Sequence, residues 1–174
     1  MQLPEINEYP QAFAGYVGLV TEADVMAALR EQIEIFRELA STMPAERETY
    51  SYAPGKWTIR QVVGHVGDGE RVFGYRALCI SRGDPASLPG FDENVYVDAA
   101  NFNATSLAAL AEEFILLRSA NLRMLEALRP DQWLRSGIAN GKTITVRAIA
   151  YVMAGHARHH LHVLGSRYAV QAGV

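Results

Sequence analysis

Residues 146–168 read VRAIAYVMAGHARHHLHVLGSRY, and their apolar residues recur with the spacing of an amphipathic helix. Thr145 precedes them and is a favourable N-cap. Each residue of a helix advances by about 100° around the axis, so His156 and His160 lie one turn apart on one face. Two imidazoles therefore lie within the stripe expected to face the core. The remainder of that stripe is Ile149, Val152, Met153 and Val163.

The pair of histidines favours a metal ion over ordinary hydrogen bonding. A buried imidazole needs partners for both ring nitrogens, because an unpaired buried polar group costs about 1–3 kcal/mol. A single such histidine is normally satisfied by protein groups. Two at positions i and i+4 suit two neutral imidazoles converging on one metal. His162 is expected on the water-facing side of this helix, together with Arg147 and Arg158, and His159 lies at the edge of the stripe.

Three further segments show helical periodicity, at about 22–42, 59–82 and 107–128. The second is the best marked, because Thr58 and Gln61 match a capping box and Gly83 follows its last residue. The remaining helix ends are marked by Thr21, Pro44, Thr105 or Ser106, and Pro130.

Four long helices predict an all-α, four-helix bundle. The second and third helices are separated by roughly twenty residues, whereas a tight turn between antiparallel helices needs only about 2–8. They can therefore run parallel, with the long segment crossing the bundle. Asn140-Gly141 favours a tight hairpin turn before the last helix. With 49% hydrophobic and 20% charged residues, the composition suits one domain over residues 1–174.

Charge and composition argue against several classes of protein. A formal net charge of −3 disfavours nucleic-acid binding, because no basic excess is available to neutralise phosphates. No stretch approaches the roughly 18 apolar residues needed to span a bilayer, and residues 1–10 do not resemble a secretory signal. The single cysteine, Cys79, excludes an intrachain disulfide and favours a cytoplasmic location.

A third metal ligand is expected from His65, which lies at the edge of the apolar stripe of the second helix. Gly69 is on the same face, where it would let another group approach closely. Three neutral nitrogens leave one coordination position open, which is typical of catalytic metal sites. Such a site keeps the double charge of the ion and favours hydroxide or thiolate as a fourth ligand. Imidazoles suit zinc, nickel, iron and copper alike.

Two histidine motifs resemble the DinB/YfiT-like superfamily: KWTIRQVVGH at residues 56–65, followed by Asp68, Glu70 and Arg71, and GHARHH at residues 155–160. The resemblance extends from about Tyr50 to Tyr168. It implies an up-down-down-up bundle with nickel or zinc held by three histidines.

Matched position by position, these ligands are His65, His156 and His160. The family includes S-transferases that use bacillithiol or mycothiol and a mycothiol-dependent isomerase, and many of its members are homodimers.

Several charged residues are candidates for supporting roles. Asp68, one turn beyond His65, is placed to orient that ring, and Glu70 is either a proton carrier or the partner of an arginine. Arg76 falls on the apolar side of its helix, where an unpaired charge is costly. It is expected to pair with Glu70 or Asp92, or else to bind an anionic substrate or cofactor. Asp92, in the crossover, is a further candidate for proton transfer.

The leading hypothesis is a metal-dependent enzyme acting on a small molecule, either a thiol S-transferase or a hydrolase. The competing hypothesis is a non-enzymatic bundle in which the metal links helices or is sensed. The fourth coordination position separates the two. A protein side chain closing it would favour the second, and a pocket lined by crossover residues would favour the first.

Overall fold

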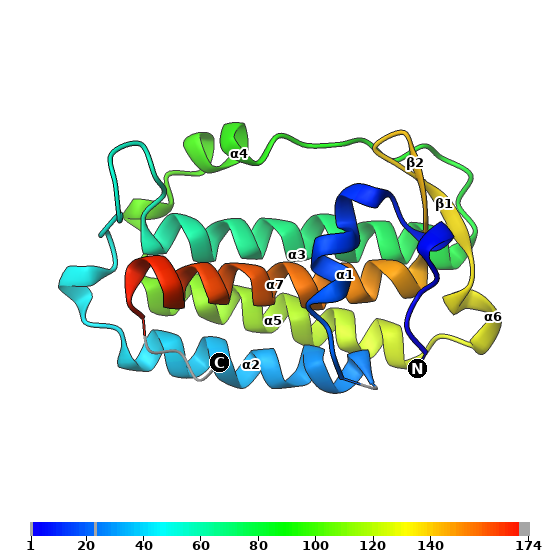
Figure 1. The fold of residues 1–174 in the computed structure, drawn as a ribbon, viewed down its shortest axis with the longest axis horizontal. Coiled ribbons are helices and arrows are strands. Elements are labelled where there is room, and N and C mark those ends of the chain that lie inside the picture. Colours follow the sequence, from blue (N-terminus) through cyan, green and yellow to red (C-terminus); the bar gives the residue numbers. More distant parts are fainter. Residues whose placement is uncertain (1, 23, 171–174) are drawn as a thin grey trace.

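A computed structural model describes residues 2–22 and 24–170 of the chain. Four long helices lie side by side: α2 (Val25–Thr42), α3 (Ile59–Arg82), α5 (Leu107–Glu126) and α7 (Val146–Tyr168) (Figure 1). The sequence colours show that α2 and α7 run in one direction and α3 and α5 in the other. The predicted up-down-down-up bundle is therefore confirmed, with α3 and α5 parallel.

The apolar faces of the four helices meet in the centre. Helix α3 packs against α5 and α7, and α2 packs against the same two helices from the opposite side. The aromatic rings of Phe36 and Phe114 lie with their centroids 4.2 Å apart, and both side chains are fully buried. Burying a side chain of this size contributes about 1.5–3 kcal/mol, so the periodic apolar stripes account for the assembly.

Most of the predicted helix ends are confirmed. Thr58 and Gln61 form the capping box of α3, and Gly83 ends that helix with a left-handed φ of 79°. The side chains of Ser106 and Thr145 cap α5 and α7. The predicted start of α2 after Thr21 was wrong, since the helix begins at Val25 with Asp24 as its N-cap.

The crossover contains a helix that was not predicted from the sequence. Helix α4 spans Glu93–Ala100, and a 3-10 turn, Phe102–Ala104, follows it. The turn packs tightly on α3, because a Cβ on Gly64 would lie 2.5 Å from the ring of Phe102. The crossover is thereby held against the bundle.

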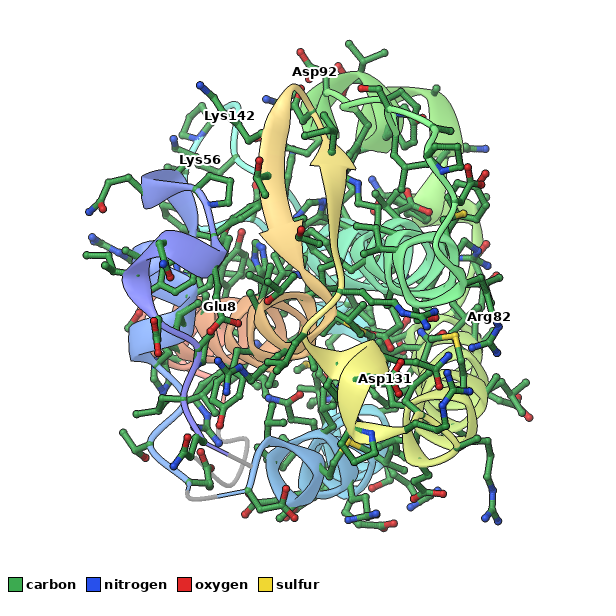
Figure 2. All side chains as sticks on the ribbon, turned by 90° about the vertical axis from the view of Figure 1, so that its right-hand side faces the viewer. Glu8, Lys56, Arg82, Asp92, Asp131 and Lys142 are labelled. Atoms are coloured by element: carbon green, nitrogen blue, oxygen red, sulfur yellow. The ribbon has the colours of Figure 1, made fainter. Side chains whose placement is uncertain are left out.

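A short hairpin stands at one end of the bundle (Figure 2). Strands β1 (Ser136–Ala139) and β2 (Lys142–Thr145) pair antiparallel. Asn140 and Gly141 between them have φ of 51° and 69°, as the predicted tight turn requires. Leu88 of the crossover bonds to the backbone of Ile138 and Asn140, so the crossover and hairpin are joined. The four-residue helix α6 (Pro130–Trp133) precedes the hairpin.

The N-terminal segment lies across α7, with α1 (Ala14–Gly18) crossing the long helix (Figure 1). Two ion pairs hold it there, between Glu8 and Arg147 and between Glu22 and Arg158. The expectation that these two arginines face water was therefore wrong, because a segment distant in sequence covers them. None of the helices in the described ranges has the length and apolar character needed to cross a membrane.

Candidate metal centre

Three imidazoles from two antiparallel helices converge at one point. His65 comes from α3, and His156 and His160 from successive turns of α7. One nitrogen of each ring lies within 4.8 Å of those of the other two. The Nε2 atoms of His65 and His156 are 3.0 Å apart. Nitrogens bound tetrahedrally at about 2.0–2.1 Å from an ion would be roughly 3.3 Å apart, so this spacing is close to that of a metal site.

A glycine allows α3 and α7 to approach at this point. A Cβ on Gly69 would lie 2.6 Å from Cε1 of His156, which is closer than real contacts allow. Any larger residue would displace the imidazole. The close approach predicted for this glycine is therefore present, and the approaching group is His156.

Burial keeps the three imidazoles uncharged. Their residues are 5%, 5% and 9% exposed for His65, His156 and His160. Loss of water lowers the pKa of His65 from 6.5 to about 4 and that of His160 to about 3. The pKa of His156 also lies well below the usual value, first through burial and then through the neighbouring histidines. Neutral imidazole is the form that binds metals, so the site is prepared for an ion near pH 7.

The facing nitrogens of the cluster can bind one shared divalent ion, because each ring offers one nitrogen to the same point. The Nδ1 atom of His65 is buried and has no hydrogen-bond partner within the described ranges. The rings around the cluster are largely apolar: Trp57 lies 4.9 Å from the His65 ring, and Phe73 5.6 Å from that of His156, between centroids. No aspartate, glutamate or cysteine of the described ranges joins the three histidines. The donor set is thus three neutral nitrogens.

A pocket of about 420 Å³ opens onto all three histidines. Its size falls within the usual range for small-molecule sites. Its other lining residues come from the N-terminal segment, the segment before α3, the crossover, the hairpin turn and helices α3 and α7: Ala12, Phe13, Tyr16, Trp57, Phe73, Arg76, Phe91, Glu93, Asn140 and His159. The histidine cluster therefore faces a cavity on one side and the bundle core on the other.

Glu70 is not part of this pocket. Its carboxylate accepts two hydrogen bonds from Arg118, at 2.9 and 2.8 Å, and one from Asn121 at 2.8 Å. Of the two roles predicted for Glu70, the structure supplies the arginine partner. Arg118 was not predicted as this partner from the sequence. The sequence did hold one indication of its burial: Arg118 lies one turn from Phe114 and one turn from Leu122, on the apolar face of α5.

Asp68 and Asp92 both lie outside the pocket lining. Asp68 pairs with Arg71 at 3.7 Å, and no hydrogen bond joins it to His65. Asp92 caps α4, accepting from the backbone of Asn94 and Val95. The neighbouring Glu93, in the first turn of α4, lines the pocket instead.

Arg76 lines the pocket, and the ion pair predicted for it is not formed. Glu70 is bound to Arg118, and Asp92 is occupied as a helix cap. Arg76 instead donates one hydrogen bond from Nη2 to the carbonyl of Pro89, at 2.8 Å. The predicted ion pair was wrong because helix packing brings Glu70 to Arg118, and Asp92 caps α4.

Comparisons with known proteins agree with this fold. A family model described as the DinB superfamily matches residues 28–164, which include all three histidines. The structure of YfiT from Bacillus subtilis, described as a probable metal-dependent hydrolase with an unusual four-helix bundle topology, superposes with a TM-score of 0.72. It is 18% identical, over 94% of this chain and 95% of that one.

The mycothiol-dependent maleylpyruvate isomerase superposes with a TM-score of 0.66 at 13% identity. The match covers 86% of this chain and 60% of the isomerase. No protein with a curated description matches in sequence. At these identities the two structures show a shared fold.

Proposed function

Because this chain belongs to the DinB superfamily and brings three buried histidines to the wall of one pocket, we propose that it is a metal-dependent enzyme acting on a small molecule. His65, His156 and His160 would hold one divalent ion, with zinc, nickel and iron all suited to three imidazoles. The observation that carries the proposal is the open side of the cluster, where a cavity rather than a side chain adjoins the three nitrogens.

An ion bound in this way supplies a Lewis acid that lowers the pKa of a water or thiol next to it. The chain's own residues would do the rest. Trp57, Phe73 and Tyr16 surround the histidines with rings and limit the access of bulk water. Glu93 provides a carboxylate to the pocket lining, and its negative charge acts to raise the pKa of His65 against the larger effect of burial. It is placed to accept a proton released there, a role that replaces the one expected for Asp92.

Hydrolysis is the first reaction that we propose. It needs only water as a co-substrate, and the likeness to YfiT extends over nearly the whole of both chains. Transfer to or from a low-molecular-weight thiol such as mycothiol or bacillithiol is the second candidate, supported by the likeness to the mycothiol-dependent isomerase. Both reactions would use the same three ligands and the same pocket.

The non-enzymatic bundle that links helices through a metal is less well supported. It would need a fourth ligand from the protein, and within the described residues the histidine cluster has no fourth member. The lining contributed by Phe91 and Glu93 of the crossover is the feature expected of an enzyme.

Elemental analysis of untagged protein tests the metal. We expect about one equivalent of a divalent ion per chain. At a free metal concentration 100 times the dissociation constant, binding should raise the free energy of unfolding by about 2.7 kcal/mol. His160→Ala should abolish both effects. His162→Ala, which removes an exposed imidazole from the same helix, is the matched control and should change neither.

Turnover assays with the loaded protein then separate the reactions. Hydrolysis of a panel of aryl esters and amides without thiol would support the first candidate. Turnover of an electrophile only when mycothiol or bacillithiol is added would support the second. A chain that binds one ion through these histidines and turns over neither panel would favour the non-enzymatic bundle. A purified chain that binds no metal would contradict all three.

A further inference from the structure

Arg76 is a buried cation on the wall of the same pocket. Its residue is 5% exposed, and the carbon Cζ of the guanidinium lies 5.8 Å from the ring centroid of Phe73. Nη2 donates to the Pro89 carbonyl, which satisfies one of the five N–H groups that the guanidinium carries. Burial lowers the pKa of Arg76, yet a guanidinium remains charged in proteins. The fold therefore keeps a positive charge largely out of water.

Most other arginines that are shielded from water in this bundle have a carboxylate partner, whereas Arg47 donates to the backbone carbonyl of Tyr168. Arg118 binds Glu70 in the core, and Arg60 binds Glu48 near the start of α3. The two arginines that hold the N-terminal segment are paired with Glu8 and Glu22. Within the described ranges Arg76 has no ion pair. An uncompensated buried charge is unfavourable, so a bound anion would stabilise Arg76 where the described residues provide no carboxylate.

The pocket around Arg76 is lined mainly by rings. Phe13, Phe73, Phe91 and Trp57 contribute aromatic faces. Phe73 is close to both the guanidinium and the histidine cluster, because its ring centroid is also 5.6 Å from that of His156. A single small molecule can therefore contact Arg76 at one end and approach the three histidines at the other.

We infer that the pocket binds an organic carboxylate with an apolar or aromatic body, and that Arg76 binds the carboxylate group. A guanidinium presents parallel N–H groups that match the two oxygens of a carboxylate. Glu93 also lines the pocket, but it is exposed, so water screens its charge more than that of Arg76. The inference rests on the proposed function in one respect: the carboxylate is taken to be the substrate of the metal centre.

Paired ligands that differ only in charge provide the test. We choose 3-phenylpropanoate and its neutral amide, titrated calorimetrically into the full chain. Each titration is run with metal bound and again after removal of the metal by a chelator, because a carboxylate can also bind a metal directly. The wild-type chain should bind the acid at least tenfold more tightly than the amide in both forms.

Arg76→Gln should lower the affinity for the acid about tenfold and leave that for the amide unchanged. Arg82→Gln, which removes the same charge from an exposed position at the end of the same helix, is the matched control and should bind both ligands as the wild type does (Figure 2). Arg76→Lys keeps the charge but loses the two-pronged geometry, so an intermediate loss is expected. If Arg76→Gln does not fold, the affinity of Arg76→Lys for the acid and the amide provides the test.

The inference is overturned if the wild-type chain binds acid and amide equally, or if removing Arg76 leaves the affinity for the acid unchanged. An acid preference present only with metal bound would also overturn it, because the metal would then be the anion site. A chain that takes up no metal at all and still prefers the acid would retain this inference and lose the proposed function, so the two failures are distinguishable.

Discussion

The Glu70–Arg118 cluster and the three-histidine cluster are both buried, and each takes one residue from α3. They differ in how their polar atoms are paired. In the first, the carboxylate and guanidinium bond to each other, to Gln32 and to Asn121. In the second, three uncharged rings line a cavity, and Nδ1 of His65 has no hydrogen-bond partner among the residues that the structure describes. Glu70 follows His65 by five residues, which turns it about 140° around the helix. One helix thus supports two sites of opposite character.

The difference indicates which cluster serves the fold and which is a candidate ligand site. A fully paired buried network holds its helices in one arrangement. Gln32, which accepts from Arg118, also donates to the carbonyl of Ala154, two residues before His156. The network therefore positions the turn of α7 that carries the candidate ligands. The histidine cluster instead brings the Nε2 atoms of His65 and His156 within 3.0 Å of each other, an arrangement that a shared metal ion would stabilise. Charged groups in a core are by themselves no sign of function, whereas incomplete pairing beside a cavity is.

Breaking the paired cluster should have the largest effect. Glu70→Gln leaves Arg118 buried without its counter-charge, so the free energy of unfolding should fall by about 3–5 kcal/mol. Denaturation with urea measures the change. Glu126→Gln is the control, because its partner Arg30 is half exposed, and it should cost at most about 1 kcal/mol. Folded Glu70→Gln protein should still bind one metal ion. Normal stability with lost activity would instead make Glu70 a proton carrier.

Lowering the pH should destabilise the metal-free chain through the histidine cluster. In the metal-free chain the pKa of His65 is about 4, against about 6.5 when unfolded. Below pH 6.5 the unfolded state binds more protons, so this contribution to stability is complete above pH 6.5 and is lost as the pH falls towards 4. One pKa unit corresponds to about 1.4 kcal/mol, so His65 alone should account for a loss of about 3 kcal/mol.

Urea denaturation of the metal-free chain at several pH values measures this loss. His65→Gln isolates the contribution from that of other titrating groups, because its stability should decline less steeply between pH 6.5 and 4 than that of the wild type. Equal slopes for the two chains would show that His65 is not held uncharged by burial.

Substitutions of two glycines on α3 should have the smallest effects on stability, and they compare the two clusters directly. A Cβ on Gly69 would meet His156 at 2.6 Å, and one on Gly74 would meet the amide of Asn121 at 2.5 Å. Gly69→Ala should displace the imidazole and weaken metal binding. Gly74→Ala should leave metal binding intact and disturb only the paired network. Overpacking costs about 1–3 kcal/mol and alanine regains about 1 kcal/mol in a helix, so each net loss of stability should be near 1 kcal/mol.

Competition with a coloured chelator measures the metal affinity of both glycine variants, and urea denaturation measures their stability. A weaker metal affinity in Gly74→Ala, equal to that in Gly69→Ala, would mean that the two clusters act as one unit rather than as separate sites.

Local patterns in the sequence were sufficient for the helices. The capping box at Thr58 and the termination at Gly83 depend on neighbours a few residues away, and both predictions were confirmed. The turn at Asn140-Gly141 was predicted for the same reason. The placing of His156 and His160 on one buried face needed only the helical period, whereas His65 entered as the only other histidine and through the family resemblance.

What tertiary structure alone decided was the pairing of charges between distant segments. Glu70 bonds to Arg118, 48 residues away, and this leaves Arg76 without the acid expected for it. The pocket is lined by Glu93 rather than Asp92, because the cap of α4 uses the first of these adjacent acids. Helical periodicity and capping involve residues close in sequence and can be read from it. Side chains brought together by packing follow no spacing rule, so their partners become known only once the helices are in place.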